Sequence, residues 1–172
     1  MEFDLPVDRK TDRITKIMVL SIVVSAFLPA LIFHAMDILF DPLILAIAVL
    51  IAVTTLSLIP VFYFYTPKKI ILNQESGSLI IDRKFGRIRI PYDSIDDVVF
   101  IGSPKLRKVS GSAGFFGYFG SFIAEGIGDV RVFARRGRDF VLIKTNGRNY
   151  LISPENPDKF VKELRRRIGL AG

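Results

Sequence analysis

Two long apolar segments occupy the first third of the chain and constrain its fold more than any other feature. Ile17 to Phe33 and Leu43 to Tyr65 contain no charged residue. Each is close to the length of about 20 residues with which a helix crosses the hydrocarbon core of a bilayer. The segment 34–41 between them has two acidic residues and no Lys or Arg. The sequence therefore predicts a transmembrane helical hairpin over residues 14–65, with helices at about 14–35 and 42–65.

Basic residues flank the outer ends of both apolar segments and are absent between them. Because the cytoplasmic flanks of membrane helices carry an excess of Lys and Arg, this pattern places both ends of the hairpin in the cytoplasm. We expect a multi-pass protein of the cell membrane with both termini cytoplasmic. Residues 1–13 are expected to be a cytoplasmic tail, frayed or ordered on contact, and residues 66–172 a cytoplasmic domain. The flanking residues are Arg9, Lys10, Arg13, Lys16, Lys68 and Lys69.

The chain offers few side chains for catalysis or metal binding. It has no Cys, which excludes disulfides, thiolate metal sites and a Cys nucleophile. The one His, His34, lies at the outer edge of the first apolar segment, where an interfacial position is expected. Asp96 and Asp97 are neighbours in a predicted strand, so their side chains point to opposite faces and do not form a carboxylate pair. We expect a protein that is not an enzyme and has no metal and no cofactor.

The part of the chain after the hairpin is strongly basic. From Thr66 onward it has 20 Lys and Arg against 11 Asp and Glu. A basic domain beside the inner leaflet is attracted to anionic lipids, by about 1 kcal/mol for each well-placed basic residue. The same charges can simply keep a small domain soluble. Nucleic acid is not an expected partner, because the chain is held at a membrane and has no recognised nucleic-acid-binding motif.

The periodicity changes from helical to strand-like after residue 69. Short runs of β-branched and aromatic residues alternate with turn sequences, of which Asn146-Gly147 is the strongest hairpin signal. After Ser153 and Pro154 the pattern becomes helical again, with basic residues around one apolar stripe. That stripe is formed by Phe160, Val161, Leu164 and Ile168. The predicted strands are 70–72, 79–83, 87–90, 95–101, 130–134, 140–145 and 149–152.

Several motifs occur in an order that is typical of one family. Pro91, Tyr92 and Ile95 form a Pro-Tyr-x-x-Ile corner, a glycine-aromatic segment follows at 111–122, and Ile-Ser-Pro at 152–154 precedes the last helix. Over residues 62–168 the chain resembles the bacterial and archaeal pleckstrin-homology (PH) domain family, whose members often carry two membrane helices ahead of the domain. The resemblance implies an α+β chain: a two-helix transmembrane hairpin, then a PH-like β-roll of about seven antiparallel strands capped by a C-terminal helix. It implies no catalytic residue.

The glycine-aromatic segment, residues 111–128, is the most distinctive motif. Glycines recur every third residue at its start, which suits either small residues on one face of a helical turn or a flexible insertion between strands. Exposed aromatic clusters are costly in water, so these rings are expected to meet the bilayer, another subunit or their own domain. The predicted partner-contact residues are Phe115, Phe116, Tyr118, Phe119 and Phe122.

A second candidate site is a rim of basic side chains, which can bind lipid phosphates. In eukaryotic PH domains the phosphoinositide-binding residues typically lie in the loop between the first two strands. Here that loop, residues 73–78, has Glu75 and no Lys or Arg, which argues against a pocket of that kind. We therefore expect nonspecific attraction to anionic lipids. The rim residues are Lys68, Lys69, Lys105, Arg107, Lys108, Arg135, Arg136 and Arg138.

A domain that is already fixed by two spans does not need lipid affinity to reach the membrane, so its surface is free to hold proteins. The leading hypothesis is a non-enzymatic scaffold or assembly module that binds protein partners or copies of itself. The alternative is a lipid-sensing module that reads anionic headgroups through the basic rim. A second alternative is an accessory subunit of a membrane transporter or protease complex.

Overall fold

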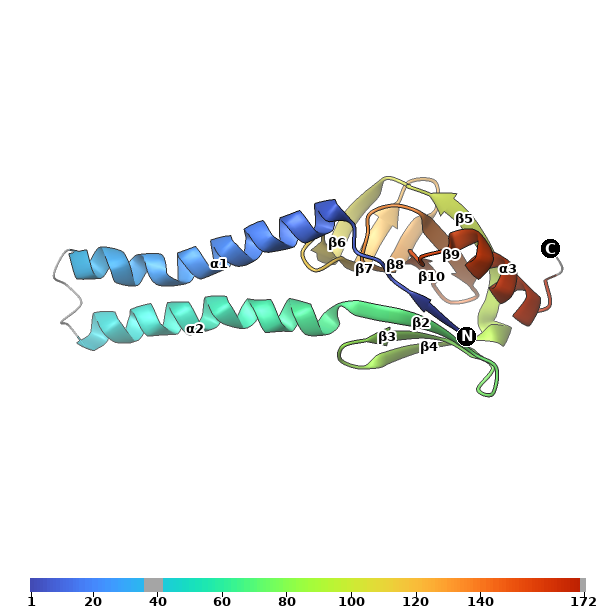
Figure 1. Cartoon of the computed structure of the whole chain (residues 1–172), viewed down its shortest axis with the longest axis horizontal. Coiled ribbons are helices and arrows are strands. Elements are labelled where there is room, and N and C mark those ends of the chain that lie inside the picture. The colour runs from blue at the N-terminus through green and yellow to red at the C-terminus, as the bar shows by residue number, and fades with distance from the viewer. Residues whose placement is uncertain (36–41, 171–172) are drawn as a thin grey trace.

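The computed structural model describes residues 1–35 and 42–170, which form a helical rod and a β-rich domain (Figure 1). The rod consists of α1 (Arg9–Ala35) and α2 (Pro42–Tyr65), which pack side by side. Most of the predicted connection between them, residues 36–41, lies outside the described residues. The rod joins the β domain at the N-terminal end of α1 and the C-terminal end of α2 (Figure 1).

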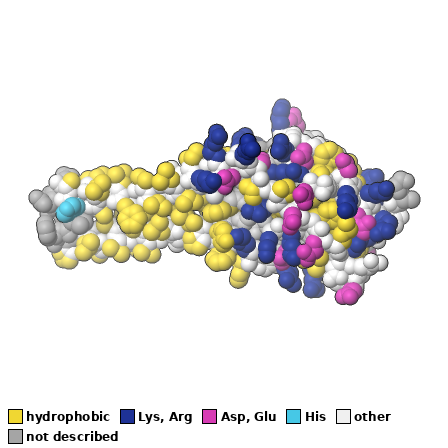
Figure 2. All heavy atoms as spheres, in the orientation of Figure 1, with side chains coloured by type: hydrophobic (Ala, Val, Ile, Leu, Met, Phe, Trp, Pro, Cys, Tyr) yellow, Lys and Arg dark blue, Asp and Glu magenta, His cyan; other side chains and the backbone are white. Residues whose placement is uncertain are grey.

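Apolar side chains cover the rod, whereas charged side chains gather over the β domain (Figure 2). Both helices are long and apolar enough to cross a membrane, and only 6% of the most apolar window of each is buried within the chain. The core helix of a soluble domain buries its apolar stripe against other elements. The apolar side chains of these two helices are instead mostly exposed.

The first helix begins earlier than residue 14, the start expected from the sequence. Asp8 precedes the first turn, and its carboxylate accepts a hydrogen bond of 2.6 Å from the N–H of Thr11. This is the bond by which an acidic residue satisfies a free amide at a helix start. Asp12 and Lys16 form an ion pair of 2.7 Å one turn further on. These contacts extend the helix to Arg9.

The first residues of the chain form a strand, which differs from the tail expected over residues 1–13. β1 (Glu2–Asp4) pairs antiparallel with β2 (Pro67–Asn73), with Phe3 opposite Ile70. The side chains of Phe3 and Leu5 are buried in the core of the β domain. The chain therefore begins inside this domain and then leaves it to form α1 (Figure 1).

The strands form two sheets. The first has the order β1-β2-β3-β4, in which β3 (Ser78–Arg83) and β4 (Arg87–Pro91) continue from β2 as antiparallel neighbours. A 3-10 turn at Tyr92–Ser94, the predicted corner, leads to the second sheet, of order β5-β9-β10-β8-β7-β6. Its strands are β5 (Ile95–Gly102), β6 (Leu106–Ala113), β7 (Tyr118–Ala124), β8 (Gly128–Ala134), β9 (Phe140–Thr145) and β10 (Asn149–Ile152).

The C-terminal helix α3 (Pro157–Arg167) covers the core between the two sheets, as predicted. Phe160 and Leu164 from its apolar stripe are fully buried, and Val161 and Ile168 are partly buried against the same cluster. The ring of Phe160 packs edge-on against Phe3 with 5.1 Å between centroids. The predicted α+β class, with a β-roll capped by a C-terminal helix, is confirmed.

The described residues contain ten strands, more than the seven or so expected. The main addition is the hairpin of β6 and β7, which includes most of the glycine-aromatic segment. Gly111 and Gly120 lie opposite each other in this hairpin at positive φ. A Cβ atom on Gly111 would collide with the carbonyl oxygen of Phe119. β8 and β10 run parallel, whereas the other described pairs are antiparallel.

Candidate functional site

The turn between β3 and β4 fastens the β domain to the end of α2. The N–H groups of Lys84 and Phe85 donate to the carbonyl oxygens of Thr66 (3.2 Å) and Phe64 (3.0 Å). A helix end leaves its last carbonyls without intrahelical partners, and this turn supplies two donors in that region. The ammonium of Lys84 also lies 3.3 Å from the centroid of the Tyr63 ring. The orientation of the domain on the rod therefore rests on hydrogen bonds as well as on a short linker.

The turn between β6 and β7 inserts between the two helices and the β domain. The N–H of Phe116 donates to the hydroxyl oxygen of Thr15 at 2.9 Å, and that hydroxyl donates to the carbonyl of Gly114 at 3.4 Å. The ring of Phe115 packs against Phe62 with 5.2 Å between centroids. The turn thus contacts α1 through hydrogen bonds and α2 through aromatic rings.

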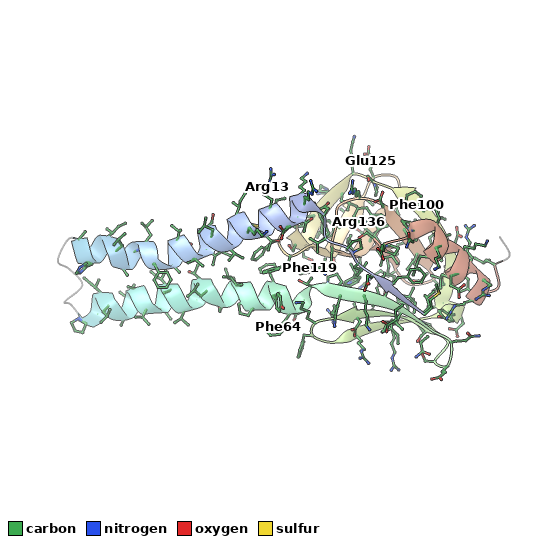
Figure 3. The ribbon with its side chains drawn as sticks, in the orientation of Figure 1. Arg13, Phe64, Phe100, Phe119, Glu125 and Arg136 are labelled. Carbon is green, nitrogen blue, oxygen red and sulfur yellow. The ribbon has the colours of Figure 1, made fainter. Side chains whose placement is uncertain are left out.

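The five predicted partner-contact residues lie in different surroundings in the structure. Phe115 and Phe119 are buried against the end of α2, and Phe119 is labelled at that junction in Figure 3. Phe122 is buried in a second core cluster within the β domain. These three rings are therefore covered by the chain itself, one of the outcomes considered from the sequence. Phe116 and Tyr118 stay partly exposed, so contact with a partner there remains a prediction.

The predicted basic rim does not form one continuous surface. Lys68 and Lys69 lie on β2, Lys105 precedes β6, Arg107 and Lys108 lie on β6, and Arg135, Arg136 and Arg138 follow β8. Several of these residues already have acidic partners: Lys69 pairs with Glu2 (2.7 Å), Lys105 with Glu125 (3.5 Å), and Arg136 and Arg138 share Asp139 (3.4 and 3.9 Å).

Arg135 differs from its two neighbours. Arg136 is further held by a hydrogen bond of 2.7 Å to the carbonyl of Pro154, and Arg138 points to solvent beside Asp139. Arg135 is partly buried, and no acidic or hydrogen-bond partner of it is found in the described parts of the chain. Its Nε atom is buried without a partner, as are those of Arg83 and Arg136. Burial lowers the pKa of Arg135. The side chain lines a cavity of about 440 Å³ at the junction, together with Thr11, Thr15, Tyr63 and Phe116.

A larger groove of about 690 Å³ runs between α3 and β5. Its apolar wall includes Phe100, which is 43% exposed, and Val161 and Leu170. Phe100 is labelled beside α3 in Figure 3. The groove lies at the end of the β domain that is farthest from the rod (Figure 1).

Basic side chains surround this groove. Lys162, Arg165 and Arg166 line it together with Asp158. Arg165 donates from Nε to the carbonyl of Val98 at 2.9 Å and pairs with Asp97 at 3.1 Å, so part of the free edge of β5 is already satisfied. Arg166 pairs with Glu163 at 2.8 Å. The groove therefore combines apolar contact area with basic side chains, two of which, Arg165 and Arg166, already have acidic partners.

Sequence reasoning missed both the groove and the distinct position of Arg135. A register shift between Phe100 and Gly102 accompanies the exposure of Phe100, and no sequence signal marks this irregularity. Within residues 1–35 and 42–170, no cluster of three or more His, Asp or Glu side chains is placed to hold a metal ion. What the arrangement offers chemically is binding: an apolar, basic groove at one end and an unpaired guanidinium at the other.

The comparison with known proteins identifies the β domain. No curated protein and no solved structure matches the chain significantly. Residues 68–168 match the profile of the bacterial PH domain family, and this range includes β2 except its first residue, the strands β3 to β10 and the helix α3. Since the match covers more than half of the 172 residues, the chain belongs to the bacterial PH domain family.

Proposed function

We propose that this chain is a non-enzymatic membrane protein whose PH domain holds a partner protein at the membrane surface. In this proposal α1 and α2 are two membrane spans, with both chain ends on the cytoplasmic side. The exposure of their apolar side chains supports insertion, and the basic residues at the domain end of the rod support this orientation.

The groove between α3 and β5 is the observation that carries the proposal. With α1 and α2 in a bilayer, the groove faces away from the membrane, because it lies at the opposite end of the domain (Figure 1). Its volume of about 690 Å³ is within the range of binding pockets. Phe100 and Leu170 are large apolar residues that stay exposed there, as anchors for a partner do.

Charge identifies the kind of partner. Lys162, Arg165 and Arg166 favour a protein segment that carries acidic side chains beside its apolar ones. Two copies of this basic groove facing each other would repel, which argues against self-association through it. β5 is an edge strand, so an extended segment can add backbone hydrogen bonds beyond the part that Arg165 occupies. A subunit of a membrane transporter or protease complex is one class of partner that fits.

The test uses the full-length protein in lipid nanodiscs and a displayed library of random peptides. We expect the enriched peptides to combine acidic and apolar residues and to lose binding to a Phe100→Asp variant. Val109→Asp places the same charge at another exposed apolar position, on β6, and serves as the matched control. Enrichment without acidic residues, or equal binding to wild type and Phe100→Asp, contradicts the proposal.

A further inference from the structure

Side chains close the free edge of β5 at one residue, Val98. The N–H of Val98 donates to the carboxylate of Asp97 at 2.7 Å, and its carbonyl accepts from Nε of Arg165 at 2.9 Å. A second nitrogen of Arg165 donates to the same carboxylate oxygen of Asp97 at 3.1 Å. These three hydrogen bonds satisfy the donor and the acceptor that a neighbouring strand would use.

The next residue of β5 that faces this edge has no such cover. β5 pairs with β9 in continuous register from Val98 to Phe100. Since the backbone groups of an antiparallel strand alternate in direction, the N–H and the carbonyl of Phe100 point to the same edge as those of Val98. Within residues 1–35 and 42–170, no backbone hydrogen bond joins Phe100 to α3 or to a loop. The edge of β5 in the groove is therefore closed at Val98 and open at Phe100.

The pair that closes the edge is accessible from the groove. The side chains of Asp97 and Arg165 are each 35% exposed, and an ion pair in contact with water contributes little to stability. Arg165 also lines the groove, so a carboxylate that enters can contact it there. Hydrogen bonds between charged groups are about twice as strong as those between neutral groups. Arg165 can therefore leave Asp97 at low cost only when another carboxylate replaces it.

We propose that Arg165 selects acidic partners for the groove by exchanging one carboxylate for another. An acidic side chain of the partner replaces Asp97 on Arg165, and the backbone of the partner pairs with β5 at both Val98 and Phe100. A neutral segment leaves Arg165 with Asp97 and finds only Phe100 open. The inference rests on the proposed function of the groove and assigns the recognition of the acidic side chain to one residue.

The test measures peptide binding to the full-length protein in phosphatidylcholine nanodiscs by fluorescence anisotropy. The probes are a synthetic peptide of alternating valine and glutamate, which favours an extended strand, and the same peptide with glutamine in place of glutamate. We expect the wild type to bind the glutamate peptide about tenfold more tightly, the effect of one hydrogen bond between charged groups. Arg165→Ala should bind both peptides equally.

Arg166→Ala is the matched control for Arg165→Ala. It removes the same charge from the next position of α3, and Arg166 pairs with Glu163 rather than with β5. The preference for the glutamate peptide should persist in this variant. An equal loss of preference in Arg165→Ala and Arg166→Ala overturns the proposal, because the acidic side chain is then attracted only by the summed charge of the groove.

Asp97→Asn tests the exchange with a smaller change to the fold. Asparagine can still accept the N–H of Val98, but it does not compete as a carboxylate for Arg165. We expect Asp97→Asn to bind the glutamate peptide about tenfold more tightly than the wild type does. Asp158→Asn removes the same charge from the wall of the groove and should have a smaller effect. Unchanged or weaker binding by Asp97→Asn, or an equal gain in Asp158→Asn, overturns the exchange.

Two further measurements separate this inference from the proposed function. Equal binding of the glutamate peptide to the wild type and to Phe100→Asp overturns the function of the groove and the exchange together. When Phe100→Asp loses binding but Arg165→Ala keeps the wild-type preference, only the exchange is overturned. Methylation of the backbone nitrogens of the glutamate peptide should abolish binding, because pairing with β5 uses its N–H groups. Equal binding of the methylated peptide contradicts strand pairing at Val98 and Phe100.

Discussion

The hydroxyl oxygen of Thr15 accepts a hydrogen bond of 2.9 Å from the backbone N–H of Phe116, 101 positions later in the chain. The same hydroxyl donates to the carbonyl of Gly114, so one side chain of α1 makes two hydrogen bonds to the backbone of the β6–β7 turn. Without this contact the backbone N–H of Phe116 lacks an acceptor at a partly buried position. Thr15 therefore couples the first helix to the far edge of the second sheet.

Thr15→Val should loosen the docking of the domain on the rod. We expect a loss of about 1 kcal/mol, the low end of the cost of leaving an amide unsatisfied, because this amide is only partly buried. Amide hydrogen exchange of the full-length protein in detergent should show faster exchange in the turn at 114–117. Thr54→Val is the matched control, because the Thr54 hydroxyl bonds only within α2, to the carbonyl of Leu50. Equal protection of the turn in both variants would show that Thr15 does not hold it.

The close pairing of Gly111 and Gly120 predicts a second sensitive position. A Cβ atom on Gly120 would collide with the carbonyl oxygen of Ser110, and its φ of +120° is unfavourable for other residues. Gly120→Ala should destabilise the protein by about 1–3 kcal/mol, as overpacking does. Gly147→Ala, where the added Cβ meets open space, should change the Tm little. Thermal unfolding of the two variants checks this, and similar Tm values would contradict the close approach of β6 and β7.

Truncation to Ala is expected to cost much more stability at Phe160, in α3, than at Phe100, in the groove beside it. Phe160 is fully buried and contacts Phe3, so Phe160→Ala should cost about 3–5 kcal/mol. Phe100 is 43% exposed in the groove, so Phe100→Ala should change stability by about 0.5 kcal/mol or less. Chemical denaturation followed by circular dichroism measures both. A large loss of stability in Phe100→Ala would mean that this ring stabilises the fold and is not available to bind a partner.

Local patterns in the sequence predicted the elements that depend on local physics. The second apolar segment, residues 43–65, agrees with the observed bounds of α2 to within one residue. The apolar stripe that includes Phe160 and Leu164 predicted that α3 covers the core. The Asn146-Gly147 turn joins β9 and β10, as its sequence predicts. In each case the signal lies within a few residues of the element that it specifies.

The elements that were missed depend on partners far away in the chain. The strand Glu2–Asp4 is too short to show an alternating pattern, and it exists because Phe3 lies opposite Ile70 on β2. The β6–β7 hairpin could not be predicted from the sequence, because regularly spaced glycines also suit a loop or a helical turn. Only the cross-strand pairing of Gly111 with Gly120 explains their positions.

The candidate sites were predictable only in part, for a similar reason. Arg135, Arg136 and Arg138 look alike in the sequence, and the basic segment was recognised as a candidate for anionic ligands. The structure separates them, because Asp139 and the carbonyl of Pro154 engage Arg136 while Arg138 remains beside Asp139. Arg135 instead lines a cavity together with residues of α1, which is far away in the chain.

The hydrogen bonds of Glu163 predict that the packing of α3 on the β domain depends on pH. Its carboxylate accepts hydrogen bonds from Arg167 at 2.8 and 2.9 Å and from Arg166 at 2.8 Å, and these bonds hold the pKa of Glu163 below its ordinary value. Arg167 also donates to the carbonyl of Leu72 at 2.9 Å, which connects α3 to β2. A carboxyl whose pKa is lowered by folding stabilises the protein above its unfolded pKa, and this contribution is lost as the pH falls through the folded pKa.

The Tm of the wild type should therefore fall as the pH decreases from about 5 to about 3. Glu163→Gln should cost about 1 kcal/mol at pH 7 and should show less of this acid-dependent decrease, since it lacks the titrating group. Glu125→Gln, which removes an exposed carboxylate paired with Lys105 at 3.5 Å, should keep the wild-type pH profile. Thermal unfolding between pH 3 and pH 7 compares the three proteins. If Glu163→Gln retains the full acid-dependent decrease, the stabilising carboxylate lies elsewhere and the Glu163–Arg167 pair does not control the docking of α3.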